Sequence, residues 1–372
     1  MIKNILIKGE LSGRGIVNFD SKEQSKTLTR HGIFPFMKDN VKLAKKAFLK
    51  TGKFKEDENG KTEIYDYKIK ISSETLRRAI FGQDVEYANG YITQNPFILA
   101  TYLLSHVGFM RGFMFPCRDL ELKRKSALTI TDAIQCNNVK SELEVGSTAG
   151  DTTIDEDGKV VRKDTSLFYT EKVGDIKYQF SGQIDIKQLQ FMSADPRLDR
   201  MAIKSDWYDS GEVDVIMANH YGKKAKYDYG IFSSMAKFTG NSYGETGILI
   251  GNDICEYIIK ATLKNILAIN INKNNSYAAT TGLKIKIVEN IIGIGQKVDD
   301  EEGWIELKTE ADVDKLNLKD LCVFYEKASE EEVKERERMI KAYDKLESSR
   351  KEKKATEKEE KKNKVKNATS KK

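Results

Sequence analysis

Arginine and lysine side chains recur in the predicted loops and strand ends of this chain, close to phenylalanine and tyrosine. A guanidinium group can bind two phosphate oxygens at once, and an aromatic ring can stack on an unpaired base. The combination is typical of a surface that binds single-stranded RNA, although a solvated surface is the alternative interpretation of each cluster. The cationic candidates are Arg14, Arg77, Arg78, Arg111, Arg118, Lys123, Arg124, Lys125, Arg162 and Lys163.

No arrangement of residues in the sequence predicts an enzyme. The three histidines occur in no catalytic or metal-binding motif, and no glycine-rich phosphate-binding motif is present. The four cysteines include no CxxC pair, so we expect free thiols. Acidic pairs such as Asp195 with Asp199 lack a third ligand at a suitable spacing, which favours loop capping over metal binding. We therefore expect no catalytic residue, no cofactor and no metal.

Composition favours one large domain or two small ones. The chain has 372 residues, of which 39% are hydrophobic and 32% charged. No run of about 18 apolar residues occurs and the first ten residues do not resemble a signal peptide, so we expect a cytoplasmic protein without membrane contact. The formal net charge of +6 lies mostly in the tail after Ser329. RNA binding by the body would therefore need local clusters of cations.

Three segments predict helices from their caps and apolar periodicity. The first begins at Ser72 or Ser73 and ends at Phe81, before Gly82. The second has Asn95 as its cap and extends over 96–108. The third is capped by Asn252 or Asp253 and has an apolar face up to residue 267. A charged helix is expected at 331–348, followed by a disordered tail.

Strands are predicted between these helices. We expect them at 2–18 and 109–115, in a hairpin over 166–193 with a bulge at Gly182, and at 281–294. Residues 21–66 are predicted to be an irregular insertion, 146–165 a loop or flexible hairpin, and 211–247 a projecting element. This order of elements predicts an α+β fold on a ferredoxin-like or RRM-like sheet.

Several stretches resemble, in order, the backbone subunit of type I CRISPR complexes, particularly the variant form of type I-F. They cover roughly residues 1–290: Gly13–Asn18, Ile71–Phe81, Gly108–Pro116, Asp164–Phe168, Gly182–Arg200 and Gly244–Asp253. The tail after Ser329 has no counterpart in this pattern, and the insertion at 151–161 differs in length. The assignments beside that insertion are therefore the weakest part of the resemblance.

The resemblance implies an RRM-like palm over residues 1–328, with a charged helix and tail at 329–372. Finger-like insertions would lie at about 21–66 and 146–165, and a thumb-like element at about 205–247. A protein of this kind is not an enzyme: it polymerises head to tail along a CRISPR RNA (crRNA) and presents it to target DNA. Its partners would be crRNA, target DNA paired with the guide, copies of itself, and the Cascade subunits that cap the guide and recognise the PAM.

On this interpretation the cationic candidates bind phosphates, and three aromatic residues either displace a base or pack against the next subunit. These residues are Tyr229, Phe232 and Phe238. Two other functions are compatible with the sequence. One is a type III-like ribonuclease that cuts target RNA with Asp20 or Asp164. The other is a structural nucleic-acid-binding protein, unrelated to CRISPR, that binds through its basic tail.

Overall fold

The protein is described by a computed structural model. It describes residues 3–15, 48–56, 63–86, 96–117, 120–137, 141–147, 152–154, 160–162, 167–173, 175–196, 198–233, 244–273, 276–289, 302–322, 326–338, 341–342, 345 and 348–349. Its helices are α3 (Ser73–Glu86), α4 (Pro96–Leu103), α5 (His106–Arg111), α6 (Ile186–Gln190), α7 (Ser205–Asp209), α8 (Glu212–Tyr221), α9 (Asn252–Leu267) and α10 (Glu310–Asp314). Residues 330–338 form a further helix.

The strands fall into one large and several small sheets. They are β1 (Asn4–Arg14), β2 (Phe48–Glu56), β3 (Glu63–Ile71), β4 (Phe113–Cys117), β5 (Leu120–Arg124), β6 (Leu128–Ile130), β7 (Ala133–Gln135), β8 (Ser141–Ser147), β9 (Thr152–Ile154), β10 (Val160–Arg162), β11 (Leu167–Val173), β12 (Asp175–Asp185), β13 (Phe191–Ser193), β14 (Tyr227–Phe232), β15 (Glu245–Ile250), β16 (Asn270–Lys273), β17 (Ser276–Val288) and β18 (Ile305–Leu307).

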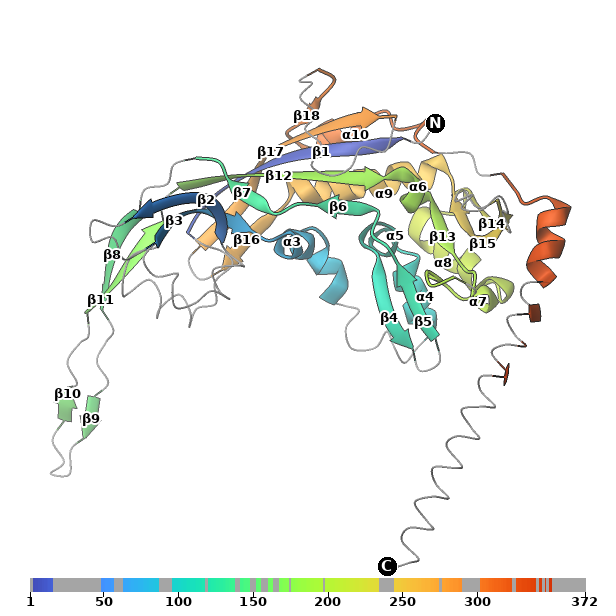
Figure 1. Ribbon diagram of the computed structural model, residues 1–372, viewed down its shortest axis with the longest axis horizontal. Coiled ribbons are helices and arrows are strands. Elements are labelled where there is room, and N and C mark those ends of the chain that lie inside the picture. The colour runs from blue at the N-terminus through green and yellow to red at the C-terminus, as the bar shows by residue number, and fades with distance from the viewer. Residues whose placement is uncertain are drawn as a thin grey trace, which may run out of the picture.

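The large sheet is centred on β1, which lies between β17 and β12 (Figure 1). Its strand order is β16-β17-β1-β12-β7-β3-β2, with β18 paired to β17 and β6 paired to β12. Strand β1 is antiparallel to both neighbours, with Ile7 opposite Gly182 on β12 and Ile285 on β17. Following the chain, the central elements occur in the order β1, α3, β7, β12, α9 and β17. The fold is therefore α+β, as predicted.

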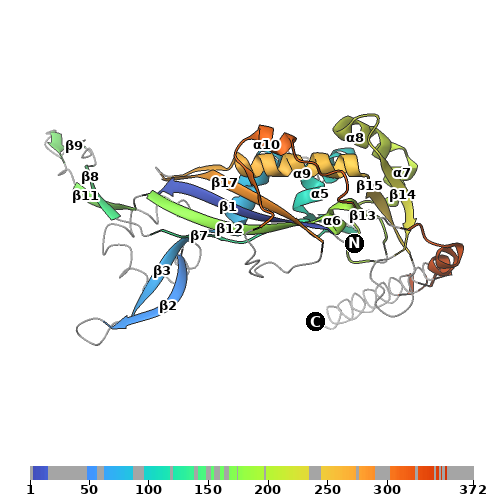
Figure 2. The ribbon, with the colours of Figure 1, turned by 90° about the horizontal axis from the view of Figure 1, so that it is seen from above.

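Helices α3, α5 and α9 lie on one side of the large sheet (Figures 1 and 2). The side chains of Ile5, Ile7 and Leu11 on β1 point toward these helices and are buried in the core. At alternate positions, Lys8 and Glu10 between them and Arg14 at the end of the strand are exposed on the other face. This alternation follows from the two-residue repeat of a strand and leaves the second face polar.

A smaller sheet, β13-β15-β14, lies at one end of the molecule beside α7 and α8 (Figure 1). The sequence predicts that this region projects from the body, but Trp207, Val213 and Met217 are buried in the core. The misleading feature was the weak periodicity of 211–247, because α8 has only 10 residues. At the other end, the β8–β11 ribbon and the β9–β10 hairpin extend away from the large sheet (Figure 1).

Three element boundaries differ from the sequence prediction. Helix α3 begins at Ser73 as predicted but continues past Gly82 to Glu86. The single helix expected at 96–108 is divided into α4 and α5, because Ser105 starts a new helix by accepting a hydrogen bond from the Gly108 amide at 3.3 Å. The strand expected at 109–115 starts only at Phe113, after Gly112 ends α5 with a φ of 72°.

Strand pairing also differs. The expected hairpin over 166–193 does not form, since β11 pairs with β8 whereas β12 pairs with β1, β6 and β7. Gly182 is not a bulge: its register with β1 is continuous, and a Cβ there would lie 3.0 Å from the Thr129 carbonyl oxygen of β6. Part of the insertion expected to be irregular, 21–66, is the β2–β3 hairpin.

Candidate nucleic-acid interface

Two arginines meet on the helix side of the sheet, where α3 contacts the end of α5. The Arg77 guanidinium donates to the Arg111 carbonyl oxygen at 2.5 Å and to the Leu128 carbonyl oxygen at 2.8 Å. It also donates to the Ser126 hydroxyl at 3.1 Å. The Arg111 guanidinium lies 3.4 Å from the Tyr102 hydroxyl. These bonds fix the direction of Arg77 and keep Arg111 beside it.

The charges of these two arginines are not balanced locally. Burial, and secondarily the nearby charge of Arg111, lowers the pKa of Arg77. Arg78 is exposed on the same helix, and the exposed Lys125 directly precedes Ser126. Within the part of the chain that the structure describes, no carboxylate forms an ion pair with any of the four residues. We call Arg77, Arg78, Arg111 and Lys125 the α3–α5 cluster.

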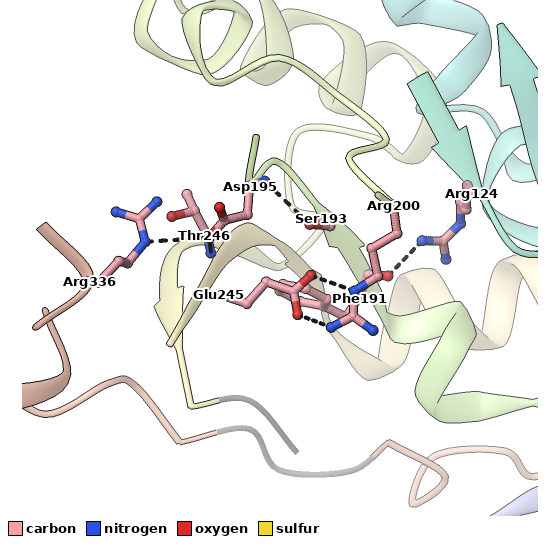
Figure 3. Close-up of polar contacts among 8 residues, drawn as sticks. All are labelled: Arg124, Phe191, Ser193, Asp195, Arg200, Glu245, Thr246 and Arg336. Atoms are coloured by element: carbon pink, nitrogen blue, oxygen red, sulfur yellow. Dashed lines mark hydrogen bonds and ion pairs between the residues drawn. The ribbon is translucent and has the colours of Figure 1, made fainter. Parts of the chain in front are cut away.

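The three consecutive cations Lys123, Arg124 and Lys125 have different surroundings. Lys123 forms ion pairs with Glu121 at 2.8 Å and Asp199 at 2.9 Å, and these contacts raise its pKa. Arg124 is only 6% exposed, and its guanidinium donates to the carbonyl oxygens of Phe109, Gln188, Leu189 and Phe191. Figure 3 shows the bond to Phe191. Lys125 alone of the three belongs to the exposed, unbalanced cluster.

Arg14 lies apart from the α3–α5 cluster. It is the last residue of β1, opposite Asp175 on β12, and belongs to the exposed set that points away from the helices. Lys8 and Lys284 share this open face and are opposite each other in the β1–β17 register. The Lys8 ammonium group is 4.4 Å from the centre of the Trp304 ring. The cationic candidates therefore divide between two faces of the sheet.

The aromatic candidates are placed on the small sheet. The Tyr229 ring stacks on Tyr208 at 3.8 Å between ring centres, with the two planes 18° apart. Phe232 is 2% exposed and packs edge to face against Phe191. Its burial excludes direct contact with a base, so we do not retain Phe232 as a base-displacing residue.

Several sequence candidates lie outside the residues whose side chains the structure describes: Asp20, Arg118, Arg162, Lys163, Asp164 and Phe238. Within the described residues, no group of three or more histidine, cysteine or acidic residues could hold a metal ion. No described helix is both long enough and apolar enough to cross a membrane.

Comparison of the whole sequence with protein families gives a match over residues 1–302 to "Type I-Fv CRISPR-associated protein Cas7fv-like". This covers most of the chain. The protein belongs to the Cas7fv-like family. The resemblance to the variant type I-F backbone subunit is thereby confirmed, while the C-terminal region after residue 302 lies outside the match. No curated protein is significantly similar to the chain in sequence.

Solved structures similar to this Cas7fv-like chain are distant. A "CRISPR RNA-guided surveillance complex" chain has a TM-score of 0.35 and 8% identity, covering 78% of this chain and 72% of that one. A pre-nicking form of such a complex has a TM-score of 0.32 and 9% identity, covering 76% and 75%. A chain of a "Type III-B Cmr-beta bound to cognate target RNA" has a TM-score of 0.24 and 9% identity, covering 50% and 49%. These scores are too low to support a conclusion.

For the Cas7fv-like chain, Arg124 is better described as a structural residue than as a phosphate ligand. Its donors are directed at backbone carbonyl groups of its own chain, which leaves little of the guanidinium accessible. Sequence analysis overlooked Ser126 and Tyr102, which position the two arginines of the α3–α5 cluster. It also overlooked Lys8 and Lys284, although the alternation of polar and apolar residues along their strands could have placed them on the open face.

Proposed function

We propose that this Cas7fv-like protein is a non-catalytic, crRNA-binding backbone subunit of a type I Cascade complex, and that the α3–α5 cluster binds the RNA phosphates. The observation that carries the proposal is that Arg77 and Arg111 lie side by side with no carboxylate partner among the described residues. A phosphate placed there would relieve the repulsion between the two guanidinium groups and accept their remaining hydrogen bonds.

The arrangement of the core is consistent with an RRM-like palm. The order β1-α3-β7-β12-α9-β17 and the central strand order β17-β1-β12-β7 agree with a β-α-β-β-α-β unit. The β8–β11 ribbon with the β9–β10 hairpin would be one finger, the insertion at about 21–66 another, and the element at about 205–247 the thumb. Copies would assemble head to tail along the guide, leaving most bases able to pair with target DNA. Other Cascade subunits would cap the two ends.

Tyr229 and Arg14 have secondary places in this proposal. Tyr229 already stacks on Tyr208, and this pair could receive a displaced base on its exposed edge or contact the next subunit. Arg14 and Lys8, on the opposite face of the sheet, would contact a different stretch of RNA or a neighbouring copy. Arg162, Lys163 and Arg118 stay candidates for phosphate binding on the strength of the sequence.

The test is RNA binding as a function of salt. We expect Arg111→Glu and Lys125→Glu each to weaken binding of a labelled crRNA, measured by fluorescence anisotropy. The slope of log K against log salt should become shallower by about 0.7 for each phosphate contact removed. Lys319→Glu is the matched control, because Lys319 is exposed and far in sequence from the cluster. If Arg111→Glu and Lys125→Glu bind as tightly as this control, the cluster is not the RNA site.

Assembly is tested separately by electron microscopy. The wild-type protein should form filaments whose length increases with the length of the RNA, whereas the two cluster variants should form fewer and shorter ones. A protein that stays monomeric with RNA of every length would contradict the backbone function itself, independently of which residues bind phosphate.

A further inference from the structure

The C-terminal arm, which we define as residues 326–338, extends the small sheet at its β14 edge. The Ser233 amide donates to the Glu326 carbonyl oxygen at 2.9 Å, and the Ala328 amide donates to the Ile231 carbonyl oxygen at 2.9 Å. Phe232 and Lys327 are bridged in the antiparallel direction. Because β14 is the last strand of the order β13-β15-β14, the arm covers the Ile231–Ser233 end of an edge that would otherwise present unpaired backbone groups there.

The helix at the end of the arm is fixed to the same edge. Ser329 and Glu332 form a reciprocal cap: the Ser329 amide donates to the Glu332 carboxylate at 2.7 Å, and the Glu332 amide donates to the Ser329 hydroxyl at 3.3 Å. The Glu332 carboxylate also accepts a hydrogen bond from the Ser233 hydroxyl at 3.0 Å. The direction of the helix is therefore set by the end of β14.

One helical turn after Glu332, the arm supplies a counter-charge to the body of the protein (Figure 3). The Arg336 guanidinium lies 3.5 Å from the Asp195 carboxylate, and the side chains are 13% and 0% exposed. Asp195 follows β13 and lies 3.4 Å from the Thr246 amide on β15. A buried carboxylate inside the region matched by the family is thus paired with an arginine outside that region. An uncompensated charge at this depth is strongly destabilising.

The start of the arm borders a cavity. A cavity of about 710 Å³ lies between the start of the arm and the β14–β15 pair, with Tyr227, Phe232, Leu249, Cys322 and Glu326 in its walls. The ion pair between Lys327 and Asp228, at 2.9 Å, is on the exposed outside of the arm and contributes little. Among the described residues, the attachment includes two backbone hydrogen bonds, the Glu332 cap and the buried Arg336–Asp195 pair.

We propose that the β14 edge and Asp195 together form a strand-docking site, that the C-terminal arm occupies this site within the same chain, and that Arg336 is the residue that holds it there. The partner that the uncovered edge fits is a second copy of the chain, because an exposed β14 edge presents the same unpaired groups on both molecules and can pair antiparallel with itself. The arm thus prevents edge-to-edge association of the free protein. This inference does not depend on RNA binding.

Hydrogen exchange in the full-length protein tests the attachment directly, because the Ser233 and Ala328 amides are the donors that join the arm to β14. In Arg336→Met we expect these two amides to exchange at least roughly 100-fold faster, since one partner of a buried ion pair is lost. Arg338→Met is the matched control: Arg338 lies on the same helix, is 81% exposed, and pairs only with Glu335 among the described residues. Wild-type exchange rates in Arg336→Met would overturn the proposal.

Two further measurements complete the test. If Arg336→Met exposes amides throughout the large sheet, the double variant Asp195→Asn with Arg336→Met is used instead, because it removes both charges and keeps the body folded. In this variant we expect fast exchange confined to the Ser233 and Ala328 amides. Full protection of both amides would overturn the proposal. Light scattering without RNA should show a concentration-dependent dimer for the variant with a released arm and a monomer for Arg338→Met. A released arm in a protein that stays monomeric would refute the second copy as the partner.

Discussion

Replacing Arg124 by methionine should destabilise the protein far more than the same change at Lys125. The Arg124 guanidinium is buried and donates to four carbonyl oxygens, including those of Phe191 at 2.6 Å and Leu189 at 3.1 Å. Methionine retains the apolar stem but has no donors, and it lacks the guanidinium group whose central carbon lies 5.3 Å from the centre of the Phe109 ring. A hydrogen bond from a charged group contributes about 1.5–3 kcal/mol, and each carbonyl left unpaired costs about 1–3 kcal/mol.

These contributions are not additive, because the bonds to Phe191 and Gln188 are only partly buried and the burial cost of the charge is removed as well. We expect a net loss of about 3–5 kcal/mol in the free energy of unfolding for Arg124→Met. For Lys125→Met we expect a change within about 0.5 kcal/mol, since that side chain is exposed. Urea unfolding followed by tryptophan fluorescence, to which the buried Trp207 contributes, measures both. An Arg124→Met protein within about 1 kcal/mol of wild type would refute the structural role assigned to this arginine.

Three further predictions concern other sites. Burial alone would raise the pKa of Asp132, but hydrogen bonds from Lys70 at 2.7 Å and the Ser73 amide at 2.8 Å outweigh it and lower the pKa. The ionised Asp132 therefore stabilises the protein above its ordinary pKa of 3.8, and this stabilisation is lost as the pH falls through the lower pKa of the folded state. The urea midpoints of wild type and Asp132→Asn should differ at about pH 7 and converge at about pH 3. The hydrogen bond between the two thiols, together with burial, raises the pKa of Cys255, whereas the same bond lowers the pKa of Cys322 despite burial. Iodoacetamide should therefore label Cys322 before Cys255 in the native protein, and mass spectrometry showing the reverse order would contradict this. Gly112→Ala should destabilise the protein by about 1–3 kcal/mol more than Gly211→Ala. Both glycines have positive φ, but only at Gly112 would a Cβ atom clash with the backbone, 2.5 Å from the Arg124 carbonyl oxygen. Equal thermal midpoints for the two variants would contradict this prediction.

The local spacing of apolar and polar residues was sufficient to predict the helices and strands that bury one face and expose the other. The alternation in β1 and β12 and the apolar face of α9 are visible in the sequence because each depends on the two-residue or 3.6-residue repeat of its own segment. Together they were sufficient to predict an α+β fold. The spacing of apolar residues in 252–267 predicts that Tyr257 lies on the apolar face of α9. Its side chain is 51% exposed, because the boundary of a buried face depends on which neighbours cover it.

The sequence also determined where cations cluster, but not which of them face solvent. Lys123, Arg124 and Lys125 are three consecutive cations that the sequence does not distinguish. In the structure, Lys123 is paired with carboxylates, Arg124 is buried among carbonyl groups, and Lys125 is exposed. Glu121 and Phe109 are near in sequence, but the other partners come from β13, α6 and the Asp199 loop, more than 60 residues away along the chain. Contacts of that range follow from how the sheet and helices pack together, and no local pattern records them.

Arg14 and Arg336 show the same distinction at the level of the whole fold. The sequence indicates an arginine at a strand end and another in a charged helix, both typical of a solvated surface. Only the pairing of β1 with its two neighbours places Arg14 on the face opposite the α3–α5 cluster. Only the docking of the arm on β14 places Arg336 beside a fully buried aspartate. The side on which a charge lies, and whether water reaches it, is decided by tertiary contacts, because burial is a property of the neighbours and not of the residue.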